Sequence, residues 1–187
     1  MSALDDFLAA AATEVARRAE IATDRPVLAE GARAFATALA AAGTVERDLT
    51  TTGVRDQLNS IDTAHAANPA LASLAVDAAR EVPWVPTPRI DGDAGATVGL
   101  GLVDKVRDFG EVTVGFMLLA PGAAYPEHTH PPQEIYLPLT GEGQWRFGGA
   151  DDYVRLADDA LVYNNPGDLH GVVAADEPEL ALYFLWP

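Results

Sequence analysis

The chain of 187 residues contains no cysteine. This absence excludes disulfide bonds, a thiolate nucleophile and sulfur ligands for a metal, so any metal must be held by His, Asp or Glu side chains. Histidine is also scarce, with four in the whole chain. A motif that uses several of these four therefore carries information about function.

Long apolar runs are missing as well. No run reaches the length of about 18 residues that a membrane span needs. The N-terminus, MSALDDFLAAAATEV, is acidic where a secretory signal is basic. We therefore expect a cytoplasmic protein that has no membrane partner.

Basic residues are few, since 12 Lys and Arg stand against 28 Asp and Glu, for a formal net charge of −16. Such a surface repels phosphate backbones and anionic lipid headgroups, which argues against nucleic acid as a partner. The acidity is equally consistent with a well-solvated surface.

The first part of the chain has a helical pattern. Apolar residues recur every three or four positions, as on one face of a helix. Gly43 is available as a C-terminal cap, and Asn68 followed by Pro69 predicts a helix start. The length fits one compact domain, in which a helical region over residues 1–85 packs on the remaining C-terminal part. The helices are predicted over residues 2–22, 27–42, 51–67 and 69–80.

Residues 86–187 have a different pattern. An extended crossing over residues 82–95, VPWVPTPRIDGDAG, leads into short apolar runs that are separated by Gly, Pro, Asp or Asn. Several strands without intervening helices predict an antiparallel sandwich or barrel. The strand candidates are TVGLGLVDKV, EVTVGFMLL, EIYLPL, GQWRF, ALVYN, HGVVA and ELALYFLW.

Two of the four histidines lie close together in the stretch GAAYPEHTHPPQEIYLPLTG, residues 122–141. Residues two apart project from the same face of a strand but diverge by roughly 200° on a helix. Prolines flank the pair on both sides and disfavour a helix there. His128 and His130 are therefore expected to point together into one cavity.

Further ligand candidates lie downstream. Glu134 and Tyr136 are again two apart, and two imidazoles with a carboxylate suit a divalent first-row metal. His170, in NNPGDLHGV, would supply a third imidazole at the start of a strand, after the turn residues of NNPG. His65 lies in the helical part and is interpreted as a surface or capping residue. The alternative for the pair is two hydrogen-bonded histidines on a polar sheet face.

The spacing of these residues resembles the first cupin motif: Gly, five residues, His, one, His, three, Glu, six, Gly. The second cupin motif is met in part, by Gly167 and His170, with Ala160 and Ala174 where the motif has Gly and Asn. The resemblance implies a mostly β fold with a C-terminal cupin (double-stranded β-helix, jelly-roll) barrel over residues 86–187. The first motif is met by Gly122, His128, His130, Glu134 and Gly141.

A narrower resemblance is to the cupin-type dimethylsulfoniopropionate lyases, which join a helical N-terminal part to a cupin barrel. Their extended motif reads Tyr, two residues, His, one, His, three, Glu, one, Tyr. The matching residues here are Tyr125, His128, His130, Glu134 and Tyr136.

This resemblance implies a carbon–sulfur lyase that cleaves dimethylsulfoniopropionate to dimethyl sulfide and acrylate. It implies one divalent metal ion (Fe, Zn, Mn, Co or Ni), a small zwitterionic or anionic substrate, and a homodimer as a common assembly. Tyr136 carries over as the base, and Tyr125 as its helper or as a substrate contact. The implied metal ligands are His128, His130, Glu134 and His170.

Three alternatives stay open: an iron dioxygenase or a sugar isomerase built on the same site, or a non-enzymatic cupin that binds a small ligand. The tyrosine two residues after Glu134 favours proton abstraction. Aromatic faces bind a sulfonium cation well, although core packing explains the same residues. The aromatic candidates for the cavity are Trp145, Phe147, Tyr163, Tyr183 and Trp186.

Overall fold

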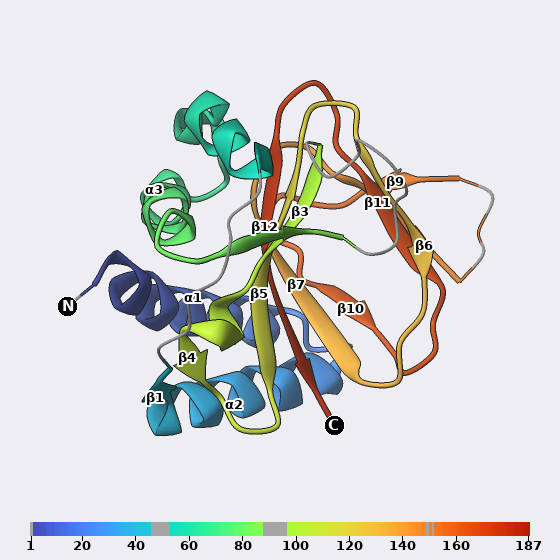
Figure 1. Cartoon of the computed structure of the whole chain (residues 1–187). Helices are drawn as coiled ribbons and strands as arrows, with labels where there is room; N and C mark the ends of the chain where they lie inside the picture. The colour runs from blue at the N-terminus through green and yellow to red at the C-terminus, as the bar shows by residue number, and fades with distance from the viewer. Residues whose placement is uncertain (1, 46–52, 88–96, 149, 151) are drawn as a thin grey trace.

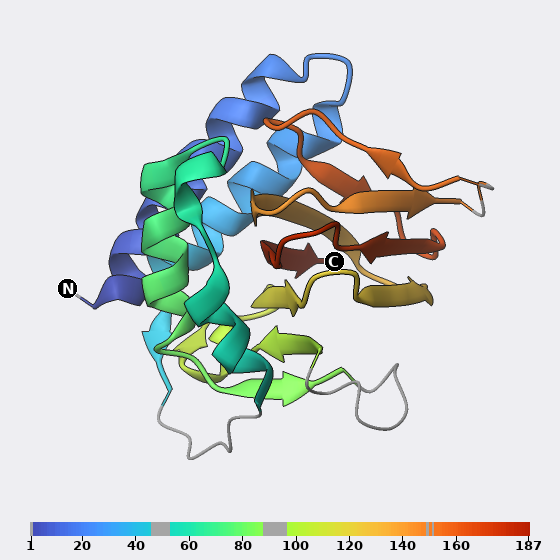
Figure 2. The ribbon, with the colours of Figure 1, turned by 90° about the horizontal axis from the view of Figure 1, so that it is seen from above.

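The computed structural model describes residues 2–45, 53–87, 97–148, 150 and 152–187. Three helices gather on one side of the molecule and two antiparallel sheets form the other side (Figure 1). Seen from above, the helices cover the outer face of one sheet, and the second sheet lies beyond it (Figure 2). None of the helices in these ranges is both long and apolar enough to cross a bilayer.

The helices begin where the sequence predicts. Ser2 caps α1 (Ala3–Ile21) by accepting from the Asp5 backbone N–H at 3.1 Å. Asn68 caps α3 (Pro69–Ala79) in the same way, and α2 spans Pro26–Ala41. In place of the helix predicted over residues 51–67 there are two short 3-10 helices, η1 (Gly53–Ser60) and η2 (Thr63–His65), and residues 51 and 52 lie outside the described residues.

The predicted cap at Gly43 is wrong. The Ala42 N–H closes α2 on the Leu39 carbonyl, and Gly43 begins β1 (Gly43–Thr44), which pairs with β4 (Arg107–Asp108). Pairing with a strand gives this backbone hydrogen-bond partners that a left-handed cap would not.

The strands form two main sheets. Each predicted apolar run contains a strand, although TVGLGLVDKV leaves the sheet after Gly101 and ends in the 3-10 helix η4 (Val103–Lys105). The predicted boundary near residue 85 falls inside β2 (Trp84–Pro86), and part of the predicted crossing, residues 88–95, lies outside the described residues. The six-stranded sheet has the order β10 (Val162–Asn164), β7 (Gln133–Thr140), β12 (Glu179–Trp186), β5 (Thr113–Leu119), β3 (Val98–Gly101) and β2 (Trp84–Pro86). The four-stranded sheet has the order β6 (Ala124–His128), β11 (His170–Val173), β8 (Gln144–Phe147) and β9 (Val154–Arg155).

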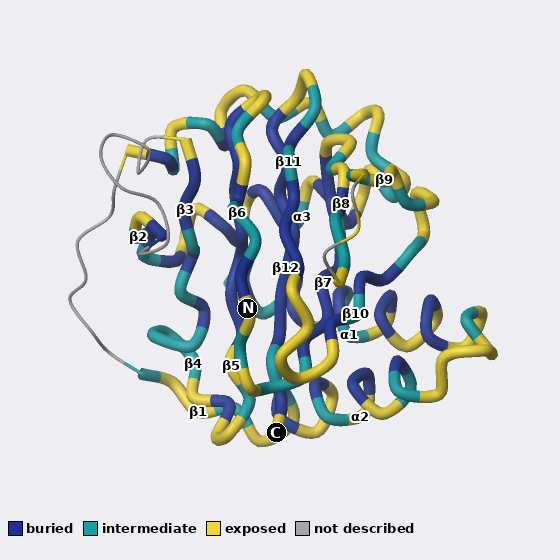
Figure 3. Tube along the Cα trace, turned by 90° about the vertical axis from the view of Figure 1, so that its right-hand side faces the viewer, coloured by how far each residue is buried: buried dark blue, intermediate teal, exposed yellow. Residues whose placement is uncertain are grey.

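The six-stranded sheet is buried on both faces. On its outer face Phe184 stacks on Phe35 of α2, with ring centroids 4.8 Å apart. Its inner face carries Tyr136 and Tyr183, which belong to a second apolar cluster between the two sheets. Because neither face meets water, β7 and β12 are buried along most of their length (Figure 3), and their sequences read as almost continuous apolar runs. This arrangement confirms the predicted cupin barrel with helices at the N-terminus.

Alternation along the strands separates the aromatic candidates. Trp145 and Tyr183 lie in the interior cluster, and Phe147 packs against it. Tyr163 and Trp186 instead pack on the helix side, where their rings are 6.1 Å apart. Successive strand residues point to opposite faces, so Tyr183 and Trp186, three positions apart, cannot share one.

One ion-pair network joins the helices to the barrel. Glu14 of α1 accepts from Arg17 and from Arg18, each at 2.8 Å. The buried Arg18 side chain also donates to the Ala160 carbonyl at 3.2 Å, in the loop before β10. The hydrogen bond from Arg17, supported by Arg18, outweighs burial and lowers the pKa of Glu14 from 4.5 to about 2.

Replacing Glu14 by glutamine should cost about 1–3 kcal/mol of unfolding free energy at neutral pH, because the buried Arg18 loses its carboxylate. The folded pKa lies below the ordinary value of 4.5. The contribution of Glu14 is therefore complete above pH 4.5 and is lost as the pH falls toward 2. Urea unfolding of both proteins over a pH series measures the difference.

The matched control is Glu20→Gln, at an exposed position of the same helix, which should change stability little at any pH. A difference between the Glu14 variant and the unchanged protein that stays constant below pH 4.5 would contradict the assigned role.

Candidate metal centre

Three of the four histidines meet between the two sheets. His128 ends β6 and His170 begins β11, and the two are directly opposite in that antiparallel pair. His130 comes two residues after His128. One ring nitrogen of each histidine lies within 4.8 Å of those of the other two. The group is largely buried and could hold a metal ion.

Backbone carbonyls orient all three imidazoles. The Nδ1 atoms of His128, His130 and His170 lie 2.9, 3.0 and 2.9 Å from the carbonyl oxygens of Pro126, Pro132 and Asp168. A carbonyl only accepts, so each neutral ring carries its proton on Nδ1 and has its lone pair on Nε2. Metal-binding histidines are oriented in this way in proteins.

One of these nitrogens shows the fit to a metal most directly. Nε2 of His170 is buried and lies 3.2 Å from Oε2 of Glu134 without a hydrogen bond, because with the ring proton on Nδ1 neither atom has a hydrogen to donate. A buried polar atom without a partner is costly, and a cation would satisfy it.

Glu134 approaches the histidines from the other sheet. Its Oε2 atom lies 3.0 Å from Nε2 of His130 and 3.2 Å from Nε2 of His170. Two ligand atoms that share a metal at about 2.1 Å, with tetrahedral or right angles between them, lie about 3.0–3.4 Å apart. Glu134 therefore fits as a ligand beside His130 and His170, and lies outside the set of three histidines whose ligand atoms are all within 4.8 Å of one another. A mixture of nitrogen and oxygen ligands suits several divalent first-row metals.

The Glu134 carboxyl is ionised despite its surroundings. Burial raises its pKa, but positive charge on the facing histidines outweighs burial: when His130 and His170 also carry a proton on Nε2, their hydrogen bonds and charge lower the pKa of Glu134 to about 2. When the two rings are neutral, a cation bound between their Nε2 atoms and this carboxylate, which is 2% exposed, would supply the positive charge instead.

A fifth residue of this centre, Asn164, was not expected from the sequence. It is the last residue of β10, opposite Glu134 in the β10–β7 pair, and its Nδ2 donates to Oε2 of Glu134 at 3.0 Å. In the sequence Asn164 is both the last residue of the strand candidate ALVYN and the first of the turn signal NNPG. The strand ends at Asn164 as predicted, but the sequence does not indicate that its amide points into the barrel. Asn164 is buried, and its Oδ1 atom has no hydrogen-bond partner.

We expect Asn164→Ala to weaken metal binding by about 10–100-fold, because Glu134 loses the amide that orients it. Competition with a chromogenic chelator measures the affinity. The control is Asn59→Ala, at an exposed position of η1, which should leave the affinity unchanged. An unchanged affinity in the Asn164 variant would remove this residue from the centre.

The two tyrosines of the motif lie beside the histidines and Glu134. The Tyr125 ring is 4.6 Å from that of His128, and Tyr136 lies between Trp145 and Tyr183, at 5.0 and 6.0 Å. Burial, and then the Glu134 carboxylate, raise the pKa of Tyr136 well above 10. The phenol therefore stays protonated unless a positive charge lies close to it.

The fourth histidine is apart from this group. His65 is exposed at the end of η2, with Nδ1 3.5 Å from a carboxylate oxygen of Asp62. Its surface position agrees with the interpretation of the sequence.

Comparison with known proteins gives a family match and a fold. The model of the dimethylsulfoniopropionate lyase family matches residues 92–181, just under half of the chain. No curated protein matches the sequence.

Two solved structures are similar over most of the chain. The DMSP (dimethylsulfoniopropionate) lyase DddQ from Ruegeria pomeroyi DSS-3 is 20% identical, with a TM-score of 0.64 over 78% of each chain. A structure from the DMSP lyases RdDddP and RnDddQII is 21% identical, with a TM-score of 0.67 over 96% of this chain and 94% of the other. At these identities the likeness establishes a shared fold.

Proposed function

Because the chain resembles the dimethylsulfoniopropionate lyases in sequence and shares a fold with two of them, we propose that it is a metal-dependent lyase that cleaves dimethylsulfoniopropionate to dimethyl sulfide and acrylate. One observation carries the proposal. Three oriented imidazoles and a buried carboxylate converge in the barrel, and the interior Tyr136 phenol comes two residues after Glu134.

His128, His130, Glu134 and His170 would hold the metal. A divalent cation supplies positive charge there, which attracts a carboxylate and lowers the pKa of a nearby phenol. A free phenol titrates near 10, so lowering its pKa to about 7 takes roughly 4 kcal/mol of differential stabilisation. Burial alone acts in the opposite direction at Tyr136.

Tyr136 acts as the base in the proposed elimination. Its phenolate oxygen takes the proton from the carbon next to the substrate carboxylate. The electron pair of that C–H bond forms the new double bond, and the bond between the β-carbon and the sulfonium sulfur breaks. Dimethyl sulfide leaves with the electron pair of the broken bond, acrylate remains, and the phenol returns its proton to solvent. Tyr125, against His128, would help Tyr136 or contact the substrate.

The aromatic residues of the interior suit the other end of the substrate. Trp145 and Tyr183 flank Tyr136 within 6.0 Å between ring centroids. Aromatic faces attract an onium cation, most strongly where water is excluded. A zwitterion with a carboxylate and a sulfonium group therefore finds a partner for each end.

The decisive experiment is headspace detection of dimethyl sulfide from the purified full chain, loaded in turn with Fe(II), Mn(II), Zn(II), Co(II) and Ni(II). At least one metal should give dimethyl sulfide and acrylate in equal amounts, and His128→Ala should not. If no metal gives a volatile product, the proposed substrate is rejected. Oxygen uptake with small acids, or ketose formation from sugars, would then identify a dioxygenase or an isomerase.

A further inference from the structure

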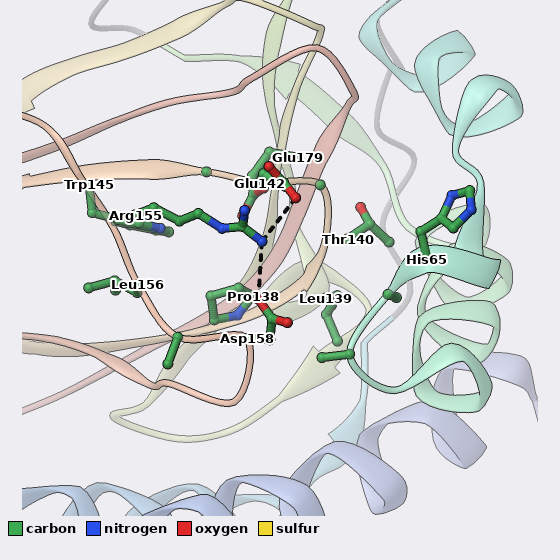
Figure 4. A pocket seen from close by; sticks show the side chains of 15 residues that line it. His65, Pro138, Leu139, Thr140, Glu142, Trp145, Arg155, Leu156, Asp158 and Glu179 are labelled. Carbon is green, nitrogen blue, oxygen red and sulfur yellow. Dashed lines mark hydrogen bonds and ion pairs between the residues drawn. The ribbon is translucent and has the colours of Figure 1, made fainter.

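A polar hollow lies at the opposite end of the barrel from the histidines. It has a volume of about 90 Å³ and lies where β7 ends and β12 begins, between the barrel and the segment around His65 (Figure 4). Thr140 comes six positions after Glu134 along β7, a distance of about 20 Å on a strand. This end of the hollow is therefore far from the metal ligands, and Trp145, which lines the hollow and packs 5.0 Å from the Tyr136 ring, lies between the two places.

A buried carboxyl group lines this hollow. Glu179 is 1% exposed and accepts a hydrogen bond from the backbone N–H of Gly143. The carboxyl group lies against the turn that Gly141 and Gly143 form. A Cβ atom at Gly141 would lie 2.7 Å from Oε2 of Glu179, and one at Gly143 would lie 2.9 Å from Oε1. The two glycines thus leave room for the carboxyl group, yet its Oε2 atom has no hydrogen-bond partner.

The Arg155 guanidinium, at the edge of the hollow, already forms two ion pairs. Arg155 extends toward Glu142 and Asp158 (Figure 4), with contacts of 2.9 and 3.3 Å. Both carboxylates are exposed, so this guanidinium is held at the mouth of the hollow. His65, on the facing segment, is the other basic side chain of the lining.

The surroundings add negative charge. A neighbouring hollow of about 430 Å³ shares His65, Gly141 and Glu142 with the first and is otherwise lined by acidic and small residues, among them Asp62, Asp176 and Glu177. Together with the net charge of −16, this concentrates cations at the mouth.

The side chains that line the hollow favour a small organic cation over a divalent metal ion. Among the described residues, the histidine group is the one set of three whose ligand atoms come close enough to share a metal, so the hollow does not offer the ligands that a divalent metal needs. Oε2 of Glu179 needs an N–H or O–H donor, and the indole of Trp145, which also lines the hollow, offers an aromatic face to a cation. A volume of about 90 Å³ exceeds that of a single water molecule and suits a small organic ion.

We propose that this hollow binds a small ammonium-type cation, such as a primary amine headgroup, with the Glu179 carboxylate as its buried anionic contact. The amine N–H donates to Oε2 of Glu179, while Trp145 covers the alkyl side of the ligand. The carboxylates of Glu142 and Asp158, shared with Arg155, attract the cation to the mouth.

Binding is linked to a proton. Burial raises the pKa of Glu179 to about 8, so at neutral pH the cation must replace the carboxyl proton. Affinity for the cation therefore rises with pH up to about 8 and then levels off.

The probe for this site is methylammonium, compared with tetramethylammonium at equal ionic strength. Above pH 8, methylammonium should raise the unfolding temperature of the full chain in a saturable way, and tetramethylammonium, which has no N–H donor, should not. Calorimetry at neutral pH, in buffers of different ionisation enthalpy, should show release of up to one proton per methylammonium bound. This measurement needs no variant and holds even if a Glu179 variant folds poorly.

Glu179→Gln should weaken methylammonium binding at least tenfold and abolish the proton release, whereas Glu20→Gln should change neither. Equal responses to the two cations, or an unchanged response in the Glu179 variant, would overturn the proposal and leave ordered water as the occupant. Production of dimethyl sulfide is a separate readout, so failure here does not depend on the lyase assignment.

Discussion

His170→Ala should lose its metal and, with it, any production of dimethyl sulfide. The variant removes one of three imidazoles whose ring nitrogens gather within 4.8 Å. It also takes away the nitrogen that lies 3.2 Å from Oε2 of Glu134. Loss of a group that only orients a ligand costs about 10–100-fold in affinity, so loss of the ligand itself should cost more than about 100-fold. Elemental analysis of dialysed protein and chelator competition measure this change.

His65→Ala is the matched control for metal content. His65 is exposed and outside the histidine group, so the variant should keep one metal ion per chain. Thermal unfolding of both variants tests whether the loss of metal is local or follows from a loss of fold. Metal retained by the His170 variant at an unchanged affinity would contradict the proposed ligand set.

Tyr136→Phe should keep its metal and lose at least about 100-fold in the rate of dimethyl sulfide release, the range expected when a general base is removed. The substitution deletes one oxygen atom and keeps the ring that packs against Trp145 and Tyr183. Stability should therefore change little. Headspace assay and metal analysis on the same sample separate the loss of the base from the loss of the metal.

Tyr163→Phe provides the comparison, because Tyr163 packs on the helix side and donates to Gln133 at 2.9 Å, outside the barrel interior. This variant should retain full activity. If the Tyr136 variant also retains activity, another group removes the proton, and Tyr125 is the next residue to test.

The sequence was most informative where a residue pattern is compatible with a single backbone conformation. A pair of histidines two apart can share a face only on extended chain, and the flanking prolines made extended chain the expected state. The helix start at Asn68 was predicted from local capping chemistry, which acts within a few residues, and the helix from Ser2 was predicted from the spacing of its apolar residues. These features depend on neighbours in sequence, so the chain alone carries them.

Features that depend on pairing across the sheets were not predictable in this way. Asn164 has the composition of a turn residue, and only its place opposite Glu134 in the β10–β7 pair brings its amide to the carboxylate. Glu179 begins an apolar strand, and only the return of the chain at Gly141 and Gly143 encloses its carboxyl group. Such contacts are fixed by strand register, which a single sequence specifies weakly.

The two sheets meet at the metal centre. His128 and His170 belong to the four-stranded sheet, and Glu134 belongs to the six-stranded sheet. A single ion held by all of them would act as a cross-link between the halves of the sandwich, since a ligand bound only to the folded state stabilises that state. Removal of the metal by a chelator should then weaken the packing between the two sheets as well as abolish the activity. The stability of the fold and the activity would both depend on the same metal–ligand bonds, so selection for either would constrain the other.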